Sequence, residues 1–135
     1  RFGRNAILVG FTTHSGTVSA ASDWGQQVER KRVRPALAGS YEQLFHICGT
    51  PNFYVDLRTP SAAVTALGAP RLERAIGVIY RPETERLSHY FHAALPQQFD
   101  AVLHYDHTRA VEPLERTPIW QRGESELPET FPSAL

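Results

Sequence analysis

Short apolar segments alternate with helical segments along this chain, and that order constrains the fold more than any other feature. Four strands are predicted, at residues 5–11, 52–58, 75–80 and 99–105. The first and third lack the polar–apolar alternation of a half-buried strand, which is typical of strands buried on both faces. The order predicts an α/β fold with a mostly parallel sheet and flanking helices.

Two helices are predicted between the first three strands. The stretch S-Y-E-Q at residues 40–43 is a capping box, in which the Ser40 hydroxyl accepts from the amide of Gln43. The apolar residues Tyr41, Leu44, Phe45 and Cys48 then recur at helical spacing. We predict a helix that Gly49 ends, with Cys48 as a buried and inert thiol. The second helix is predicted to begin at Thr59-Pro60.

The charge balance excludes some classes of partner. The chain has 135 residues, with 14 basic and 14 acidic side chains, and therefore no net charge. This removes the electrostatic argument for binding nucleic acid or an anionic membrane. With a single cysteine no intrachain disulfide can form, and no apolar run is long enough to span a bilayer. We expect a cytoplasmic protein.

Composition also divides the chain. After Glu115, proline and glutamate dominate, so we predict a domain at residues 1–116 and a weakly ordered tail at residues 117–135. Residues 25–34 are predicted to be an exposed connection, and residues 81–98 a long loop of the kind that often carries function. The chain begins with Arg1 and contains no methionine, so we expect it to be a piece of a longer protein.

A candidate site follows from where polar residues lie relative to the predicted strands. Ligands of α/β sheets bind beyond the carboxyl ends of the strands, and His14, Arg58, Arg81 and Asp106 each follow such an end. His14 lies in V-G-F-T-T-H-S-G-T-V, with Thr12 and Thr13 beside it. Two interpretations stay open for this stretch. It is either the rim of a site or a turn held by hydroxyl–backbone hydrogen bonds.

Other chemistry is less well supported. His89-x-x-His92 and His104-x-x-His107 have a spacing that would suit a metal on a helix, but neither pair lies on a predicted helix. We therefore predict no metal site and no cofactor. His104, which interrupts an apolar strand, is predicted to be a core histidine, and His46 to be exposed. Neither a G-x-S-x-G nucleophile elbow nor a phosphate-binding loop occurs in the sequence.

Six blocks in order resemble the C-terminal part of the erythromycin esterase family. They are V-G-F-T-T-H-S-G-T-V-S-A-A-S-D-W-G at residues 9–25, E-R-K-R-V-R-P-A-L-A-G-S-Y-E-Q-L-F-H at 29–46, V-D-L-R at 55–58, R-A-I-G-V-I-Y-R-P-E-T-E-R at 74–86, S-H-Y-F-H-A at 88–93 and F-D-A-V-L-H-Y-D at 99–106. The resemblance covers residues 1–115. It implies that this chain is part of a larger α/β hydrolase-type enzyme.

The resemblance also implies an activity. Such an enzyme opens an ester or macrolactone with a water that a histidine activates, and ring opening of macrolides gives antibiotic resistance in some members. The family's catalytic histidine and glutamate, and its W-A-H-N-x-H motif, lie in the N-terminal part, and nothing in this sequence matches them. No catalytic residue is therefore assigned here, and we expect the isolated chain to be inactive. The expected partner is the N-terminal part of the same protein, with a fused phosphoribosyltransferase domain in some relatives.

The residues that we expect to face a small ester or lactone substrate lie after strand ends and on the long loop. They are Thr12, Thr13, His14, Arg81, His89 and Tyr90. Together they would form the wall of a cleft that upstream residues complete. The alternative is a non-catalytic α/β module that binds a ligand or a protein, in which these polar residues belong to ordinary connections.

Overall fold

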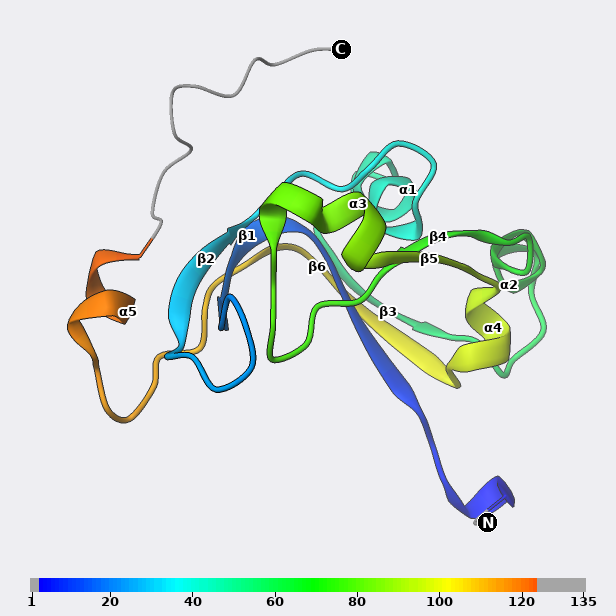
Figure 1. The fold of residues 1–135 in the computed structure, drawn as a ribbon. Coiled ribbons are helices and arrows are strands. Elements are labelled where there is room, and N and C mark those ends of the chain that lie inside the picture. The colour runs from blue at the N-terminus through cyan, green and yellow to red at the C-terminus, as the bar shows by residue number, and fades with distance from the viewer. Residues whose placement is uncertain (1–2, 124–135) are drawn as a thin grey trace.

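The computed structural model describes residues 3–123 and contains two sheets and five short α-helices in that part of the chain (Figure 1). The larger sheet has the strand order β2-β1-β6-β3, and the smaller one pairs β4 with β5. The strands are β1 (Val9–Ala20), β2 (Glu29–Val33), β3 (Asn52–Asp56), β4 (Arg71–Arg74), β5 (Tyr90–Ala93) and β6 (Ala101–Thr108). The helices are α1 (Tyr41–Ile47), α2 (Ala62–Leu67), α3 (Glu85–Ser88), α4 (Leu95–Gln98) and α5 (Pro118–Arg122), with 3-10 turns η1 (Gly3–Asn5) and η2 (Pro82–Thr84).

The larger sheet is mixed, so the α/β class is confirmed but the mostly parallel sheet is wrong. β1 runs parallel to β6, whereas β1 pairs with β2 and β3 pairs with β6 in antiparallel fashion. β1 and β2 are joined by a short connection, which allows an antiparallel pair without a crossover. The hairpin begins where Ala20 pairs with Glu29, so part of the predicted exposed connection at residues 25–34 is a strand.

Only one face of the larger sheet is covered within the described residues. On β1, Gly10 and Thr12 are buried, whereas Val9 and Phe11 are exposed. Phe11 pairs with Leu103, and Leu103 pairs with Tyr54, so an apolar row crosses the open face. The prediction that this first strand is buried on both faces is therefore wrong. An apolar run indicates strand, but it does not say which faces other elements cover.

The predicted loop around His14 is also wrong. β1 continues without a break from Val9 to Ala20, and Gly16 allows this with a φ of 126°. Beyond Gly16, β1 no longer pairs with β6 and continues as the partner of β2 (Figure 1). The long loop predicted at residues 81–98 contains η2, α3, β5 and α4. The strand predicted at 75–80 is displaced, since β4 ends at Arg74 and only Ile79 forms an isolated bridge.

The helix predictions fare better because their signals are local. Ser40 caps α1 and its hydroxyl accepts from the amide of Gln43 at 3.1 Å, as predicted. Ser61, rather than Thr59-Pro60, caps α2. Cys48 is exposed, so its prediction as a buried thiol is wrong: it lies one residue beyond the end of α1, where its thiol donates to the carbonyl of Leu44 at 3.2 Å.

The core lies between the covered face of the sheet and the helices that pack on it. Its main cluster comprises Tyr41, Phe45, Leu57, Leu67, Leu95 and Val102. A second cluster of Ala20, Val33 and Tyr80 lies where β1 and β2 pair.

Helix α5 packs on β2 and buries Trp120, although residues 117–135 were predicted to be weakly ordered. Residues 124–135 of that tail lie outside the described residues. No helix in the described part is long and apolar enough to cross a membrane.

Candidate functional site

Three histidines and one aspartate meet under the end of α1, and we call His14, His46, His104 and Asp106 the histidine cluster. The parallel pairing of β1 with β6 brings Thr12 opposite His104, and the same register brings His14 beside Asp106. Residues two apart on a strand share a face, so all four of these β1 and β6 side chains point toward α1. The last turn of α1 adds His46.

The hydrogen bond between His46 and Asp106 gives the cluster its chemical character. Nδ1 of His46 lies 2.8 Å from Oδ1 and 3.0 Å from Oδ2 of Asp106. Since an ionised carboxylate only accepts, Nδ1 carries the proton and Nε2 is left for another partner. The side chain of His46 is 44% exposed, so a small molecule can reach it. This is the arrangement of an imidazole oriented by a carboxylate for proton transfer.

His14 lies flat against His46. The two ring centroids are 3.7 Å apart and the planes are inclined by only 6°. Burial and the neighbouring His46 lower the pKa of His14. Its Nδ1 is buried and has no hydrogen-bond partner among the described residues. A neutral His14 is therefore favoured, and it fixes the plane in which His46 presents its free nitrogen.

His104 forms the floor of the cluster and is buried, as predicted for a core histidine. Its Nδ1 lies 2.9 Å from the Thr12 hydroxyl, and its ring packs against Phe45 and Phe53 with centroids 5.3 and 5.1 Å away. Burial lowers the pKa of His104. Burial raises the pKa of Asp106, but the hydrogen bonds and positive charge of His46 and the neighbouring histidines together outweigh this and hold it below the ordinary value. The cluster thus combines an ionised aspartate with two imidazoles, His14 and His104, whose pKa values are lowered by burial.

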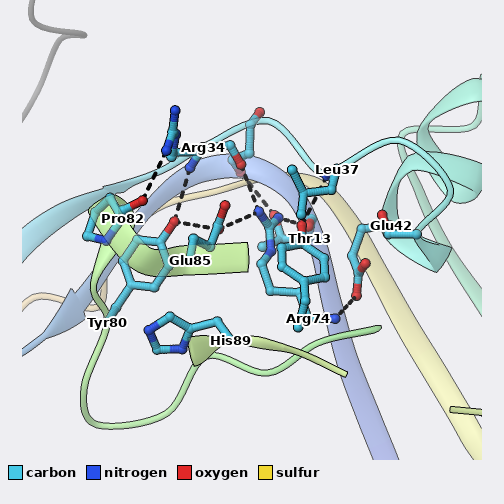
Figure 2. A network of polar contacts seen from close by, with 12 residues as sticks. Thr13, Arg34, Leu37, Glu42, Arg74, Tyr80, Pro82, Glu85 and His89 are labelled. Carbon is cyan, nitrogen blue, oxygen red and sulfur yellow. Dashed lines mark hydrogen bonds and ion pairs between the residues drawn. The ribbon is translucent and has the colours of Figure 1, made fainter. Parts of the chain in front are cut away.

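A second set of polar residues, centred on Arg74, supports the cluster from one side (Figure 2). Arg74 Nη1 lies 3.0 Å from Oε1 of Glu85, and both side chains are almost fully buried, at 1% and 2% exposed. The hydroxyl of Tyr80 donates to the same Glu85 oxygen at 2.6 Å. Hydrogen bonds satisfy this buried ion pair, which makes it a rigid part of the fold.

Arg74 connects the two sets directly. Its Nη2 donates to the backbone carbonyls of Thr13 and His14, the latter at 3.0 Å. Nη1 also donates to the carbonyl of Arg34 at 2.8 Å. Since the carbonyls of Thr13 and His14 belong to β1, Arg74 holds this strand at the point where His14 enters the cluster. We call Arg74, Glu85 and Tyr80 the arginine network.

Five of the six residues predicted for the cleft wall lie in or against one of these two sets, and Arg81 lies outside both. Thr12 and His14 belong to the histidine cluster, and Thr13 contributes its carbonyl to Arg74. His89 accepts at Nε2 from the amide of Arg81, at 3.0 Å. The side chain of Arg81 pairs with Asp23 at 3.0 Å, outside both sets.

The ring of Tyr90 lies 5.7 Å below the guanidinium of Arg74, and its hydroxyl accepts from the amide of Leu37. Tyr90 is buried, and so is His89. Their contacts are structural ones within the described residues. A role of the six in substrate contact stays a prediction.

Several residues of the site were not predicted. His46 was set aside because it lies off the apolar stripe of α1, and that position is what exposes it. Arg74 and Glu85 were missed because charged residues in R-L-E-R and T-E-R are usually solvated. The alternation of side chains between the two faces of a strand was the signal that could have grouped part of the site. Thr12 and His14 on β1, and His104 and Asp106 on β6, are each two residues apart.

The histidine pairs considered for a metal do not converge. His104 is buried on the covered face, whereas His107 is exposed and lies 3.4 Å from the Ser15 hydroxyl. His89 is bonded within the fold, and His92 is exposed. Among residues 3–123, no group of three or more His, Cys, Asp or Glu side chains has an arrangement that could hold a metal ion.

Two buried carboxyl groups lie beside the arginine network. Glu42 accepts from the amide of Arg74 at 2.9 Å, and its second oxygen has no partner among the described residues. Glu73 is 5% exposed, and its Oε2 also lacks a partner there. Burial, followed by the charge of Glu42, raises the pKa of Glu73 from 4.5 to about 7. Glu73 therefore opposes folding when it is ionised.

This gives a pH-dependent prediction. A carboxyl whose pKa is raised in the folded state loses stabilisation as the pH rises from its unfolded pKa through its folded pKa, here from about 4.5 to about 7. At pH 8, Glu73→Gln should therefore raise the free energy of unfolding by about 3 kcal/mol, with little change at pH 4. Urea unfolding at the two pH values measures this. Glu83→Gln, on an exposed turn, is the control, and an equal gain in both variants would contradict the assignment.

Comparison with known proteins gives one family and two similar structures. A sequence model described as erythromycin esterase matches residues 1–108. A succinoglycan biosynthesis protein has a TM-score of 0.65 at 23% identity, over 81% of this chain and 26% of its own. A protein from Bacillus cereus has a TM-score of 0.64 at 14% identity, over 80% and 26%. These structures show the same fold, and the chain spans about a quarter of their length.

Proposed function

This chain belongs to the erythromycin esterase family, and we propose that it is the C-terminal part of a hydrolase that opens an ester or macrolactone with a histidine-activated water. The observation that carries the proposal is the hydrogen bond between His46 and Asp106, with the imidazole half exposed. An exposed imidazole with a carboxylate at Nδ1 is equipped to exchange a proton at Nε2. A macrolide is one substrate to assay, and resistance to it would follow from ring opening.

We assign His46 to the leaving group. In ester hydrolysis the water oxygen bonds to the acyl carbon while a base takes its proton, and the family resemblance implies that this base lies upstream of the chain. The acyl C–O bond then breaks, and the departing alkoxide needs a proton. His46 supplies it from Nε2 as an imidazolium, a form that Asp106 stabilises through Nδ1, and becomes the neutral imidazole that keeps its one proton on Nδ1. Solvent returns the proton afterwards.

The other members of the histidine cluster position His46 rather than react. The stack on His14 sets the plane of the His46 ring, and Arg74 fixes the carbonyl of His14. His104 shields the inner side of Asp106, at 3.6 Å between Nε2 and Oδ1. A catalytic group must be held within a fraction of an ångström for efficient proton transfer. The arginine network therefore contributes to the site indirectly, because it holds β1 and with it His14 in place.

The role of His46 predicts a dependence on the leaving group. In a protein that carries the complete family domain, His46→Gln should lower kcat/KM for an alkyl ester by about 100-fold or more. A 4-nitrophenyl ester of the same acid releases a stable phenolate that needs no proton, so its hydrolysis should fall far less. Initial rates with both esters give the ratio. His92→Gln, an exposed histidine outside the cluster, should leave both rates unchanged.

Other outcomes separate the parts of this proposal. Equal losses on the two esters would show that His46 is structural, because a missing proton donor affects only the poor leaving group. Absence of ester and lactone hydrolysis in the unsubstituted protein would contradict the hydrolase itself and favour a non-catalytic ligand-binding module. Asp106→Asn should resemble His46→Gln, since an amide does not stabilise the imidazolium.

A further inference from the structure

A depression of about 440 Å³ lies between the end of β6, the strand β2 and helix α5, apart from the histidine cluster. Three arginines line it, namely Arg30, Arg109 and Arg116, and Trp120 contributes to its wall. In Figure 1 helix α5 lies beside β2, on the opposite side of the molecule from the β4–β5 pair. Nothing in the proposed hydrolysis uses these residues.

The depression is built by specific contacts rather than by loose surface side chains. Arg30 lies over the Trp120 ring, 5.5 Å from its centroid, and donates to the carbonyl of Gly123 at 3.1 Å. Trp120 is 7% exposed and its indole N–H donates to the Ser19 hydroxyl at 3.1 Å. These contacts hold α5 against the sheet and give the depression a fixed wall.

The charge of the depression is unusual for this chain. The protein as a whole has no net charge, yet three arginines and a single carboxylate, Glu112, meet here. Arg109 makes no hydrogen bond or ion pair within residues 3–123. Nε of Arg30 is buried and also lacks a partner in this part of the chain. Guanidinium donors without an acceptor favour an oxyanion, which they bind in a two-pronged geometry.

The carboxylate of Glu112, which lines the depression, indicates which kind of group fits beside the arginines. Glu112 pairs with Arg116 at 2.6 Å, so an oxyanion of this size is accommodated beside the arginines. We propose that Arg30, Arg109 and Arg116 bind the carboxylate or phosphate group of a small molecule, with Glu112 as an internal competitor for Arg116. Both side chains of the Glu112–Arg116 pair are about half exposed, so an added anion can displace Glu112 at low cost.

A neighbouring depression suggests what the anion is attached to. It measures about 330 Å³, shares Thr17 and Arg109 with the first, and is lined by Phe11, Val18 and Tyr105. Because apolar surface adjoins the arginines, an anion with a short apolar chain gains burial that a bare anion lacks. We therefore expect hexanoate to bind more tightly than acetate.

Tryptophan fluorescence tests this directly on the chain. Trp24 and Trp120 are the two tryptophans, and Trp24 is 79% exposed, so Trp24→Phe leaves Trp120 as the reporter. In this background, phosphate, acetate and hexanoate are titrated at constant ionic strength with chloride. At least one should give a saturable change. Arg109→Gln should weaken it at least tenfold, and Glu112→Gln should strengthen it several-fold, because Arg116 is then freed.

A control variant and the comparison of the three anions decide how the titrations are interpreted. Arg86→Gln removes an exposed arginine of α3 and should change nothing. Tighter binding of hexanoate than of acetate assigns a carboxylate with an apolar chain, and tightest binding of phosphate assigns a phosphate ester. No saturable change with any of the three anions would overturn the proposal. Equal affinities in Arg109→Gln and Arg86→Gln, both with the unfolding midpoint of the parent, would also overturn it.

Discussion

Replacing Glu85 with glutamine is expected to lower the free energy of unfolding by about 3–5 kcal/mol. The change leaves the buried Arg74 guanidinium without its counter-charge, and the two side chains are only 1% and 2% exposed. In the intact pair, the attraction between the two charges offsets the cost of removing them from water. When one partner is replaced, the charge that remains is buried without this compensation. Urea unfolding followed by circular dichroism gives the difference. Since small domains are stable by about 5–15 kcal/mol, this loss is a large fraction of the total stability.

The chain contains a matched control for this ion pair. Glu112 and Arg116 lie 2.6 Å apart, but their side chains are 51% and 57% exposed. Glu112→Gln should therefore change the free energy of unfolding by less than about 1 kcal/mol. The double variant Arg74→Met, Glu85→Met should be more stable than Glu85→Gln alone, because it leaves neither member of the pair buried without its counter-charge. Equal effects at the buried and the exposed pair would refute the role of the arginine network.

Gly16→Ala is expected to destabilise the chain by about 3 kcal/mol or more, as the second large effect. Gly16 has a φ of 126°, which an L side chain rarely adopts. A Cβ there would meet the carbonyl oxygen of Thr108 inside van der Waals contact and lie 2.6 Å from its amide nitrogen. Both atoms are backbone of β6, so the two central strands would have to separate. The midpoint of urea unfolding reports the loss.

A second glycine isolates the contribution of that contact. Gly25 also has a positive φ, of 75°, but a Cβ there would meet nothing within 4 Å. Gly25→Ala should cost only the left-handed backbone penalty of about 1–2 kcal/mol. The difference between the two variants is the cost of pushing β1 away from β6. Similar losses at both positions would show that the backbone angle alone matters.

The fold was predictable where the signals were local. The capping box and apolar stripe of α1 lie within nine residues, and the structure confirms that helix. Strand pairing was not predictable in the same way, because the partners of β1 are decided by contacts far along the chain. The apolar run at residues 5–11 shows the limit. Its composition indicated burial on both faces, but only the neighbours of a sheet decide which face is covered.

The site was predictable in part for a related reason. His14 was identified from glycine and hydroxyl neighbours, although the reason given, a loop at a strand end, was wrong. It lies within β1, on the same face as Thr12. His46 was missed because helical periodicity ranks residues by burial, whereas proton transfer needs exposure. Asp106 was named as a residue that follows a strand end, but it lies within β6, and its contact with His46 could be found only from the packing of α1 on the sheet.

The parallel pair of β1 and β6 also bears on the order in which the chain acquires its structure. Hydrogen-bonded partners such as Thr12 and His104 are 92 residues apart. Closing so long a segment costs entropy before any contact between the strands forms, and sheets of this kind fold slowly. A ribosome that has released α1 and β3 has not yet made β6. The newly made chain must therefore wait for β6, and the histidine cluster is complete only when synthesis of that strand has ended.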